Sequence, residues 1–298
     1  MKKFLEKYWK LFPAALILFV TTAAVFILDY RNEPVMYSWN ENANEKDDRL
    51  RRDIVSAINI YTDGTAQEIF HETGTLEGIA YDILRVIPSE HTFLQVDYAE
   101  EPKPLNELID EETTAAGYAY AGGINGGFFR LGETERGRPV GAVRRKNAWT
   151  IWHGEENTPA YGSGFATAYF TGNAMRLKYH GWQNGVWAGD DDWTYESGYA
   201  IDAENGISGS YTYIADGEAK DITGDDYGSV DYRTAGRAAT IFAQNAEKEY
   251  LLIEIFGVVD DSKILGFLQS LDTVNAIRMD GGLSTQMVYI RKYVAEVR

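Results

Sequence analysis

An uncharged run near the N-terminus constrains the fold most. Leu11–Leu28 contains 18 consecutive residues without a charge. As a helix this run would span ~27 Å, close to the roughly 30 Å hydrocarbon core of a bilayer. A buried core helix is the alternative, but the charged residues on both sides weigh against it. We therefore expect one transmembrane helix within residues 1–30, followed by a domain that forms separately from it.

The charges on either side of the run predict its orientation. Four lysines precede it, at positions 2, 3, 7 and 10, whereas Asp29, Arg31 and Glu33 follow it. The positive-inside bias places the N-terminus in the cytoplasm and the remaining ~270 residues outside. We expect a single-pass cell-membrane protein. The alternative is a secreted protein, because Thr21–Ala24 offers small residues at which a signal peptide could be cleaved.

The overall charge and the lack of cysteine exclude several functions. The formal net charge is −17, and this negative field argues against nucleic acid as a partner. A small anionic substrate stays open, because one arginine in a cleft can outweigh distant surface charge. The chain has no cysteine, which excludes disulfides, thiolate catalysis and cysteine-bound metal.

Strand patterns dominate the chain after residue 70. Two alternating segments, "GIAYDILRVI" and "HTFLQVDYA", are separated by Pro88-Ser89. Two hairpins are predicted, with turns at Gly172-Asn173 and Asp216-Gly217. The apolar segment "EYLLIEIFGVV" has the composition of a central strand, and "NAIRMDGG" reads as a strand that ends at an aspartate. We predict an α+β fold, in which a strand-rich mixed sheet carries a few helices.

Three segments are predicted to be helical. Charges of both signs surround regularly spaced apolar residues in Glu45–Tyr61, and Pro104–Ala119 places Leu105, Leu108 and Ile109 on one face. The segment "DSKILGFLQSL" reads as an amphipathic helix with an aspartate at its start. The predicted organisation is a membrane or signal segment at 1–30, a tether and helical lead-in at 31–70, and one domain at 71–298.

Common catalytic motifs are absent from the sequence. There is no Gly-x-Ser-x-Gly elbow, His-Glu-x-x-His pair, phosphate-binding Gly-x-x-x-x-Gly-Lys loop or helix-loop-helix calcium motif. The four histidines, at positions 71, 91, 153 and 180, show no metal-ligand spacing. We therefore predict no metal site among them.

Two glycine-dense segments and two arginines remain as candidates. "GGINGGFF" surrounds Asn125 with bare backbone, and "RMDGGLSTQM" does the same for Asp280. Glycine permits a tight turn or the close approach of a ligand. Taken alone, the first could be a buried strand-to-turn transition and the second an Asp-Gly turn. Arg233 and Arg237 precede the central strand, where an arginine can bind phosphate through two parallel hydrogen bonds or can simply be exposed.

The order of these motifs resembles the phosphodiester glycosidase family. "GGINGGFF", "GRPVGAV", "SGSYTYIADGEA", an arginine-alanine strand entry and "MDGGLSTQMV" occur in the family's order between about Glu77 and Val297. Many bacterial members are surface proteins or are linked to exopolysaccharide. Each motif is modest by itself, but their joint occurrence at these separations is fairly specific.

The resemblance implies a set of site residues. They are Asn125 with Gly126, Gly127 and Phe128; Gly141; Arg237 in preference to Arg233; and Asp280 followed by Gly281, Gly282, Ser284 and Thr285. One departure is Leu283, which stands where family members usually have a third glycine. Another is the acidic, aromatic segment Trp182–Tyr199, whose aromatic residues could stack on sugar rings.

The activity that the resemblance implies is hydrolysis of a sugar 1-phosphodiester in surface polysaccharide or a glycoconjugate. Asp280 would be the catalytic carboxylate, Arg237 the phosphate ligand, and Asn125 a hydrogen-bonding partner of the sugar or phosphate. A second carboxylate is expected among Asp190, Asp191, Asp192, Asp202 and Glu254. No cofactor is expected to be required, although the aspartates at 190–192 could bind calcium.

Two alternatives to glycoside hydrolysis stay open. The first is a non-catalytic surface glycan-binding or exopolysaccharide-assembly protein with the same fold, for which Leu283 is the motive. The second is metal-assisted cleavage on the phosphorus side of the diester. The first predicts binding without product release, and the second predicts loss of activity with a chelator.

Overall fold

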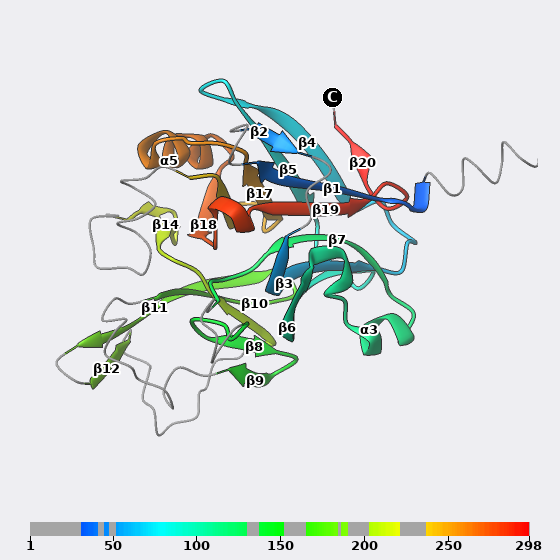
Figure 1. The fold of residues 1–298 in the computed structure, drawn as a ribbon, viewed down its shortest axis with the longest axis horizontal. Coiled ribbons are helices and arrows are strands. Elements are labelled where there is room, and N and C mark those ends of the chain that lie inside the picture. Colours follow the sequence, from blue (N-terminus) through cyan, green and yellow to red (C-terminus); the bar gives the residue numbers. More distant parts are fainter. Residues whose placement is uncertain are drawn as a thin grey trace, which may run out of the picture.

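The structure is a computed structural model that describes residues 31–40, 45–47, 52–129, 137–151, 165–183, 186–189, 203–220 and 237–297. The predicted transmembrane helix within residues 1–30 lies outside these ranges. Within them, no helix is long and apolar enough to cross a membrane. The described residues form a strand-rich α+β fold with few helices, as predicted (Figure 1).

The first sheet joins strands from near both ends of the described chain. Its order is β2 (Glu45–Asp47), β1 (Pro34–Asn40), β19 (Gln286–Ile290), β7 (Ala119–Asn125), β3 (Asp53–Thr62) and β6 (Thr92–Pro104). All neighbours pair antiparallel. Strand β19 near the C-terminus thus lies between β1 and β7, so that residues far apart in the sequence share one sheet.

The second sheet is built around a long hairpin. Its order is β12 (Val186–Gly189), β11 (Ala174–Gln183), β10 (Phe165–Thr171), β13 (Asn205–Ser208), β8 (Val143–Arg145) and β9 (Ala148–Ile151). Thr171 pairs with Ala174, which confirms the turn predicted at Gly172-Asn173. In Figure 1 the β11–β12 end of this sheet extends away from the rest of the fold.

The third sheet carries the predicted central strand. Its order is β15 (Glu218–Ala219), β14 (Thr212–Ala215), β18 (Thr273–Arg278), β16 (Ala239–Asn245), β17 (Tyr250–Ile255), β5 (Ile79–Val86), β4 (Ile69–Leu76) and β20 (Ala295–Glu296). Every residue of β17 is buried, which confirms the apolar segment as central. Ala215 pairs with Glu218, which confirms the turn at Asp216-Gly217. Only the β20–β4 pair is parallel among the described strands.

The other elements whose bounds lie within the described residues are short helices and 3₁₀ turns. They are η1 (Leu105–Glu107), α3 (Glu111–Ala115), α5 (Asp261–Ser270) and η5 (Gly282–Ser284). Helix α5 is the predicted amphipathic helix and buries Ile264 and Leu268. The predicted helix over Pro104–Ala119 is largely wrong. Asp110 instead caps a short α3 by accepting a hydrogen bond from the Glu112 amide.

The main hydrophobic core joins all three sheets. Ile58 of β3, Phe170 of β10 and Phe242 of β16 are fully buried in one cluster. The rings of Phe170 and Phe242 meet edge to face at 5.1 Å between centroids. Because one core lies between the sheets, each sheet fixes the position of strand ends on the others.

The helix predicted over Glu45–Tyr61 is wrong. The segment forms β2 and β3, and every residue of β3 after Asp53 is buried. Strand β3 lies between β7 and β6 with both of its faces covered. Such a strand is apolar on both faces, so its pattern does not alternate and can imitate that of a helix.

The tether and helical lead-in predicted at 31–70 form strands wherever the structure describes regular structure after Pro34 in this segment. Residues 34–40 form β1, which pairs with β19 from Pro34↔Ile290 to Ser38↔Gln286. Val35 and Met36 are buried in the cores on the two faces of the first sheet. The lead-in therefore belongs to the same sheet as the C-terminal motif.

A buried histidine fastens the C-terminal strand β20 to the third sheet. His71 Nε2 lies 2.6 Å from Asp82 Oδ1, and His71 Nδ1 lies 2.8 Å from Glu296 Oε2. Asp82 also binds Lys46, and Glu296 accepts from the Tyr289 hydroxyl. Both ring nitrogens face carboxylate oxygens, so each nitrogen donates a hydrogen bond and the ring is positively charged.

The His71 cluster predicts a pH-dependent stability. Burial lowers the pKa of His71, but the hydrogen bonds and charges of Asp82 and Glu296 raise it by more. The pKa therefore lies above its usual 6.5. This stabilisation is complete below pH 6.5 and is lost as the pH rises through the folded-state pKa. Relative to His71→Gln, the wild type should lose about 1.4 kcal/mol of unfolding free energy per pH unit in that interval. Chemical denaturation of both proteins from pH 6 upward measures this; a constant difference would contradict it.

Candidate active site

The two glycine-dense segments meet where β7 and β18 end. The Asp280 amide donates to the Gly126 carbonyl at 3.2 Å, and Asn125 Nδ2 donates to the Asp280 carbonyl at 2.8 Å. Nearby, the Met279 amide donates to the Thr240 carbonyl of β16 at 2.9 Å. The residues singled out in the two segments therefore lie side by side, although 155 positions separate Asn125 from Asp280.

Asn125 holds several strands together. Its Oδ1 accepts from Thr240 Oγ1 of β16 at 2.7 Å and from the Gln286 amide of β19 at 3.1 Å. The side chain is buried, and both ends of its amide are bonded to protein. The geometry thus gives Asn125 the role of positioning the Asp280 backbone, in contrast to the predicted contact with sugar or phosphate.

Asp280 lies two residues beyond the end of β18 and is partly exposed. Its Oδ1 accepts from the Gly281 amide at 2.8 Å. This charge-assisted bond orients the carboxylate on a backbone that Asn125 and Gly126 hold from the other side. A carboxylate fixed in this way is suited to act on a substrate, because little reorganisation is needed when charge develops.

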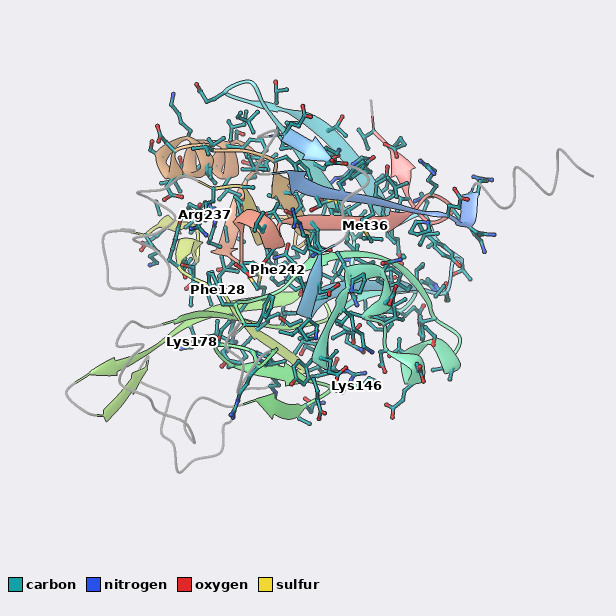
Figure 2. All side chains as sticks on the ribbon, in the orientation of Figure 1. Met36, Phe128, Lys146, Lys178, Arg237 and Phe242 are labelled. Atoms are coloured by element: carbon teal, nitrogen blue, oxygen red, sulfur yellow. The ribbon has the colours of Figure 1, made fainter. Side chains whose placement is uncertain are left out.

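Arg237 lies beside the turn that follows Asp280. The residue precedes β16 and is exposed. Its side chain passes along Gly282, where an added Cβ would lie 3.2 Å from Arg237 Cδ. Gly282 also has a φ of +62°, which disfavours any other residue. Figure 2 shows Arg237 and Phe128 on the same side of the molecule.

Tight packing explains the glycines at 126 and 127. A Cβ at Gly127 would lie 2.1 Å from the Ser208 carbonyl oxygen, and one at Gly126 would lie 2.5 Å from Ser56 Oγ. The Gly126 amide donates to the Ser56 carbonyl. These glycines allow three strands to approach one another, and the Gly126 amide is not available to a ligand.

The turn from Gly281 to Thr285 differs from the predicted ligand cradle in two ways. The Gly282 amide donates to the Ala238 carbonyl at 3.0 Å, so it is committed to the fold. Thr285 is fully buried, and its hydroxyl has no hydrogen-bond partner among the described residues. Ser284 is partly exposed and can still face a substrate. Leu283 is 44% exposed and its φ is not positive, so the turn accommodates it without strain.

The remaining predicted residues are partly described. Gly141 is buried with a φ of +108°, in a loop whose Val140 amide donates to the Phe128 carbonyl at 2.7 Å. Phe128 packs against the core of the third sheet. Arg233 lies outside the described residues. The structure therefore places Arg237 beside Gly282, in the turn that follows Asp280, and leaves Arg233 untested.

Arg278 is a buried arginine that was not among the predicted site residues. Arg278 is 2% exposed; its Nη2 donates to the Ala238 carbonyl at 3.1 Å and to the Arg237 carbonyl at 3.3 Å, and its Nη1 donates to Tyr213 at 3.0 Å. The hydroxyls of Tyr211 and Tyr213 both donate to Asp261. Arg278 therefore holds the backbone from which Arg237 extends. A charged residue inside the apolar strand "NAIRMD" was the available signal.

The second carboxylate is not found among the described residues of the site. Glu254 is fully buried behind Thr240, without access to solvent. The other four candidates, Asp190, Asp191, Asp192 and Asp202, lie outside the described residues, as does the calcium alternative at 190–192. Within the described ranges, no group of three or more acidic or histidine residues could hold a metal ion.

The family model named phosphodiester glycosidase matches residues 118–297, more than half of the chain. The chain belongs to the phosphodiester glycosidase family. This family consists of hydrolases of sugar phosphodiesters, and the resemblance seen in the sequence is confirmed. No match was found among curated proteins.

Two solved structures are similar in part. A hypothetical protein from Synechocystis has 14% identity and a TM-score of 0.41, covering 74% of this chain; this chain covers 61% of that structure. The zebrafish N-acetylglucosamine-1-phosphodiester alpha-N-acetylglucosaminidase catalytic domain, auto-inhibited by its propeptide, has 16% identity and a TM-score of 0.41, with 87% of each chain covered. Because both scores are low, membership of the family rests on the family model.

The phosphodiester glycosidase region contains Asn125, Arg237 and Asp280. It does not contain β1 or β3, which flank β19 and β7 in the first sheet. In this member of the family, residues before the matched region therefore complete the sheet on which the candidate site stands.

Proposed function

We propose that this phosphodiester glycosidase hydrolyses a sugar 1-phosphodiester of a surface polysaccharide or glycoconjugate, outside the cytoplasmic membrane to which its N-terminal helix anchors it. Asp280 is the catalytic carboxylate and Arg237 binds the phosphate. One observation carries the proposal: the Gly281 amide fixes the Asp280 carboxylate, and the exposed Arg237 side chain runs along Gly282, two residues further on.

The chemistry of the bond suits this pair of residues. Cleavage between the anomeric carbon and oxygen releases a phosphomonoester, which leaves far more readily than an alcohol, so a strong general acid is less necessary than in ordinary glycoside hydrolysis. The guanidinium of Arg237 can bind two phosphate oxygens and stabilise the charge that develops on them. The Asp280 carboxylate can stabilise the positive anomeric centre or take a proton from the attacking water.

Buried groups position both residues. Asn125 holds the carbonyl of Asp280, and Arg278 holds the carbonyl of Arg237. Neither needs to touch the substrate for this purpose. These buried hydrogen bonds keep the two reacting groups aligned. Such alignment can supply a large part of the rate enhancement of an enzyme.

The test uses the full-length chain with a panel of sugar 1-(methyl phosphates), beginning with α-N-acetylglucosamine, in water enriched in ¹⁸O. Release of sugar with unlabelled methyl phosphate is expected, because water attacks the anomeric carbon. Label in the methyl phosphate would establish attack on phosphorus and overturn the proposal. No release from any member, together with binding on a glycan array, would support the non-catalytic alternative instead.

Arg237 can be tested by comparing leaving groups. Replacing Arg237 with Ala should lower kcat/KM for the sugar phosphodiester by roughly 100-fold, because the departing phosphate loses its cation. Arg237→Lys should recover only part of this loss, since lysine cannot make two parallel hydrogen bonds. An aryl glycoside of the same sugar, with an uncharged leaving group, serves as the control. An equal loss on both substrates would contradict the role of Arg237 as phosphate ligand.

A further inference from the structure

Three polar side chains form a row across neighbouring strands of the third sheet, and the row leads toward Asp280. Glu254 of β17 stands directly opposite Asp82 of β5 on one side and Thr240 of β16 on the other. All three are fully buried. Thr240 Oγ1 lies 3.0 Å from Glu254 Oε2 and 2.7 Å from Asn125 Oδ1. The row therefore connects a buried acid to the residue that holds Asp280.

Two backbone groups fix the orientation of the Asn125 amide. The Gln286 amide can only donate, and it points to Oδ1; the Asp280 carbonyl can only accept, and it faces Nδ2. Turning the amide around would bring donor against donor and acceptor against acceptor. Oδ1 therefore lies where the structure has it and must accept from Thr240.

The direction of the remaining hydrogen bond follows. A threonine hydroxyl has one hydrogen, and Thr240 gives it to Asn125 Oδ1. The 3.0 Å contact between Thr240 Oγ1 and Glu254 Oε2 then has no hydrogen unless the carboxyl group supplies one. The other oxygen, Oε1, is buried without a partner among the described residues, which an ionised carboxylate would tolerate poorly.

We propose that Glu254 is a neutral carboxylic acid in the folded protein at neutral pH, and that its proton orients Thr240 and Asn125 and so positions Asp280. Glu254 is a positioning residue, because Thr240 and Asn125 separate it from Asp280. The effect on turnover rests on the proposed function; the protonation of Glu254 does not.

The charged groups around Glu254 agree with this assignment. Asp82 is held by Lys46 and His71, which stabilise its negative charge, and a second carboxylate directly opposite it would be destabilising. Burial raises the pKa of Glu254 well above its usual 4.5, and the charge of Asp82 raises it further; a hydrogen bond donated by Thr240 to an ionised Glu254, and the charge of Arg278, would lower it.

Stability measurements on the full-length chain test the proton. In Glu254→Gln, the side-chain amide replaces the acid as donor to Thr240 and does not titrate. Above pH 4.5 the unfolded wild type loses its glutamate proton and the folded protein keeps it. The folding equilibrium constant of Glu254→Gln relative to wild type should therefore rise about tenfold per pH unit, roughly 100-fold from pH 5.5 to 7.5. A ratio that stays constant with pH would overturn the proposal.

Infrared spectroscopy provides a test that does not depend on a variant that folds. With ¹³C-labelled glutamate in the wild-type chain at pH 8, a carbonyl band of a protonated carboxyl group should shift on labelling; labelling glutamate separates Glu254 from any buried aspartic acid. The band should be missing from Glu254→Gln. Absence of the band in the wild type would show that Glu254 is ionised and would overturn the proposal.

Turnover tests the positioning role separately. Glu254→Leu removes the donor to Thr240, so kcat on an active sugar phosphodiester should fall at least about tenfold with little change in KM. Glu254→Gln should restore most of that loss. Equal kcat values in the two variants would overturn the positioning role. Absence of turnover in the wild type would contradict the proposed function, whereas the stability and infrared results would still decide the protonation of Glu254.

Discussion

Replacing Asp280 with Asn is expected to reduce release of sugar from a sugar 1-phosphodiester by roughly 1000-fold. The change removes the negative charge that stabilises the anomeric centre or activates water. It preserves the shape of the side chain, and the amide oxygen can still accept from the Gly281 amide, as Asp280 Oδ1 does at 2.8 Å. Single-turnover and steady-state rates of the two full-length proteins measure the effect.

The fold of the Asp280→Asn variant must be checked by thermal denaturation. A midpoint within a few degrees of the wild type is expected, because the hydrogen bonds of the Asp280 backbone to Gly126 and Asn125 are unchanged. A folded variant that retains more than about one tenth of the wild-type rate would remove Asp280 from the chemistry, since general acid–base groups are worth at least roughly 100-fold.

Replacing Gly127 with Ala is expected to destabilise the protein by about 3 kcal/mol or more. The added methyl group would lie 2.1 Å from the carbonyl oxygen of Ser208, a backbone atom that can move only with its strand. Displacement of β13 or of the turn after β7 would also shift Asp280, whose amide is bonded to Gly126. Chemical denaturation should therefore show the loss, together with reduced turnover.

Gly266 offers a matched control for that substitution. It lies exposed in helix α5, and an added Cβ would meet no atom within 4 Å. Gly266→Ala should stabilise the protein by about 0.5–1 kcal/mol, because alanine loses less backbone entropy in a helix. If Gly127→Ala were as well tolerated as Gly266→Ala, the close approach of β7 and β13 would not be a constraint on the fold.

Local patterns predicted the parts of the fold that local chemistry determines. The turns at Gly172-Asn173 and Asp216-Gly217 join strands as expected, and α5 begins at Asp261, the aspartate predicted at its start. The strand β3 could not be recognised in the same way. It pairs with β7 and β6 at its two edges, and its two faces are buried in two different cores, none of which is evident from its own residues.

In the candidate site, too, some residues could be predicted from the local sequence and others could not. Asp280 and Arg237 could be selected from residue type and from the family resemblance, and the structure places the Arg237 side chain along Gly282, two residues after Asp280. The roles of Asn125, Arg278 and Glu254 could not be predicted. Each depends on which backbone carbonyls and hydroxyls surround the side chain, and strands far apart in the sequence supply those groups.

The pairing of β1 with β19 affects how this enzyme can be dissected. Excising only residues 118–297, the stretch recognised as the family, would leave β19 without β1 and β7 without β3. Beginning the chain at about residue 44 would still delete β1 and open an edge on the strand that follows the Asp280 turn. The region that matches the family model is therefore shorter than the part of the chain that folds together. A fragment for expression has to begin before Pro34.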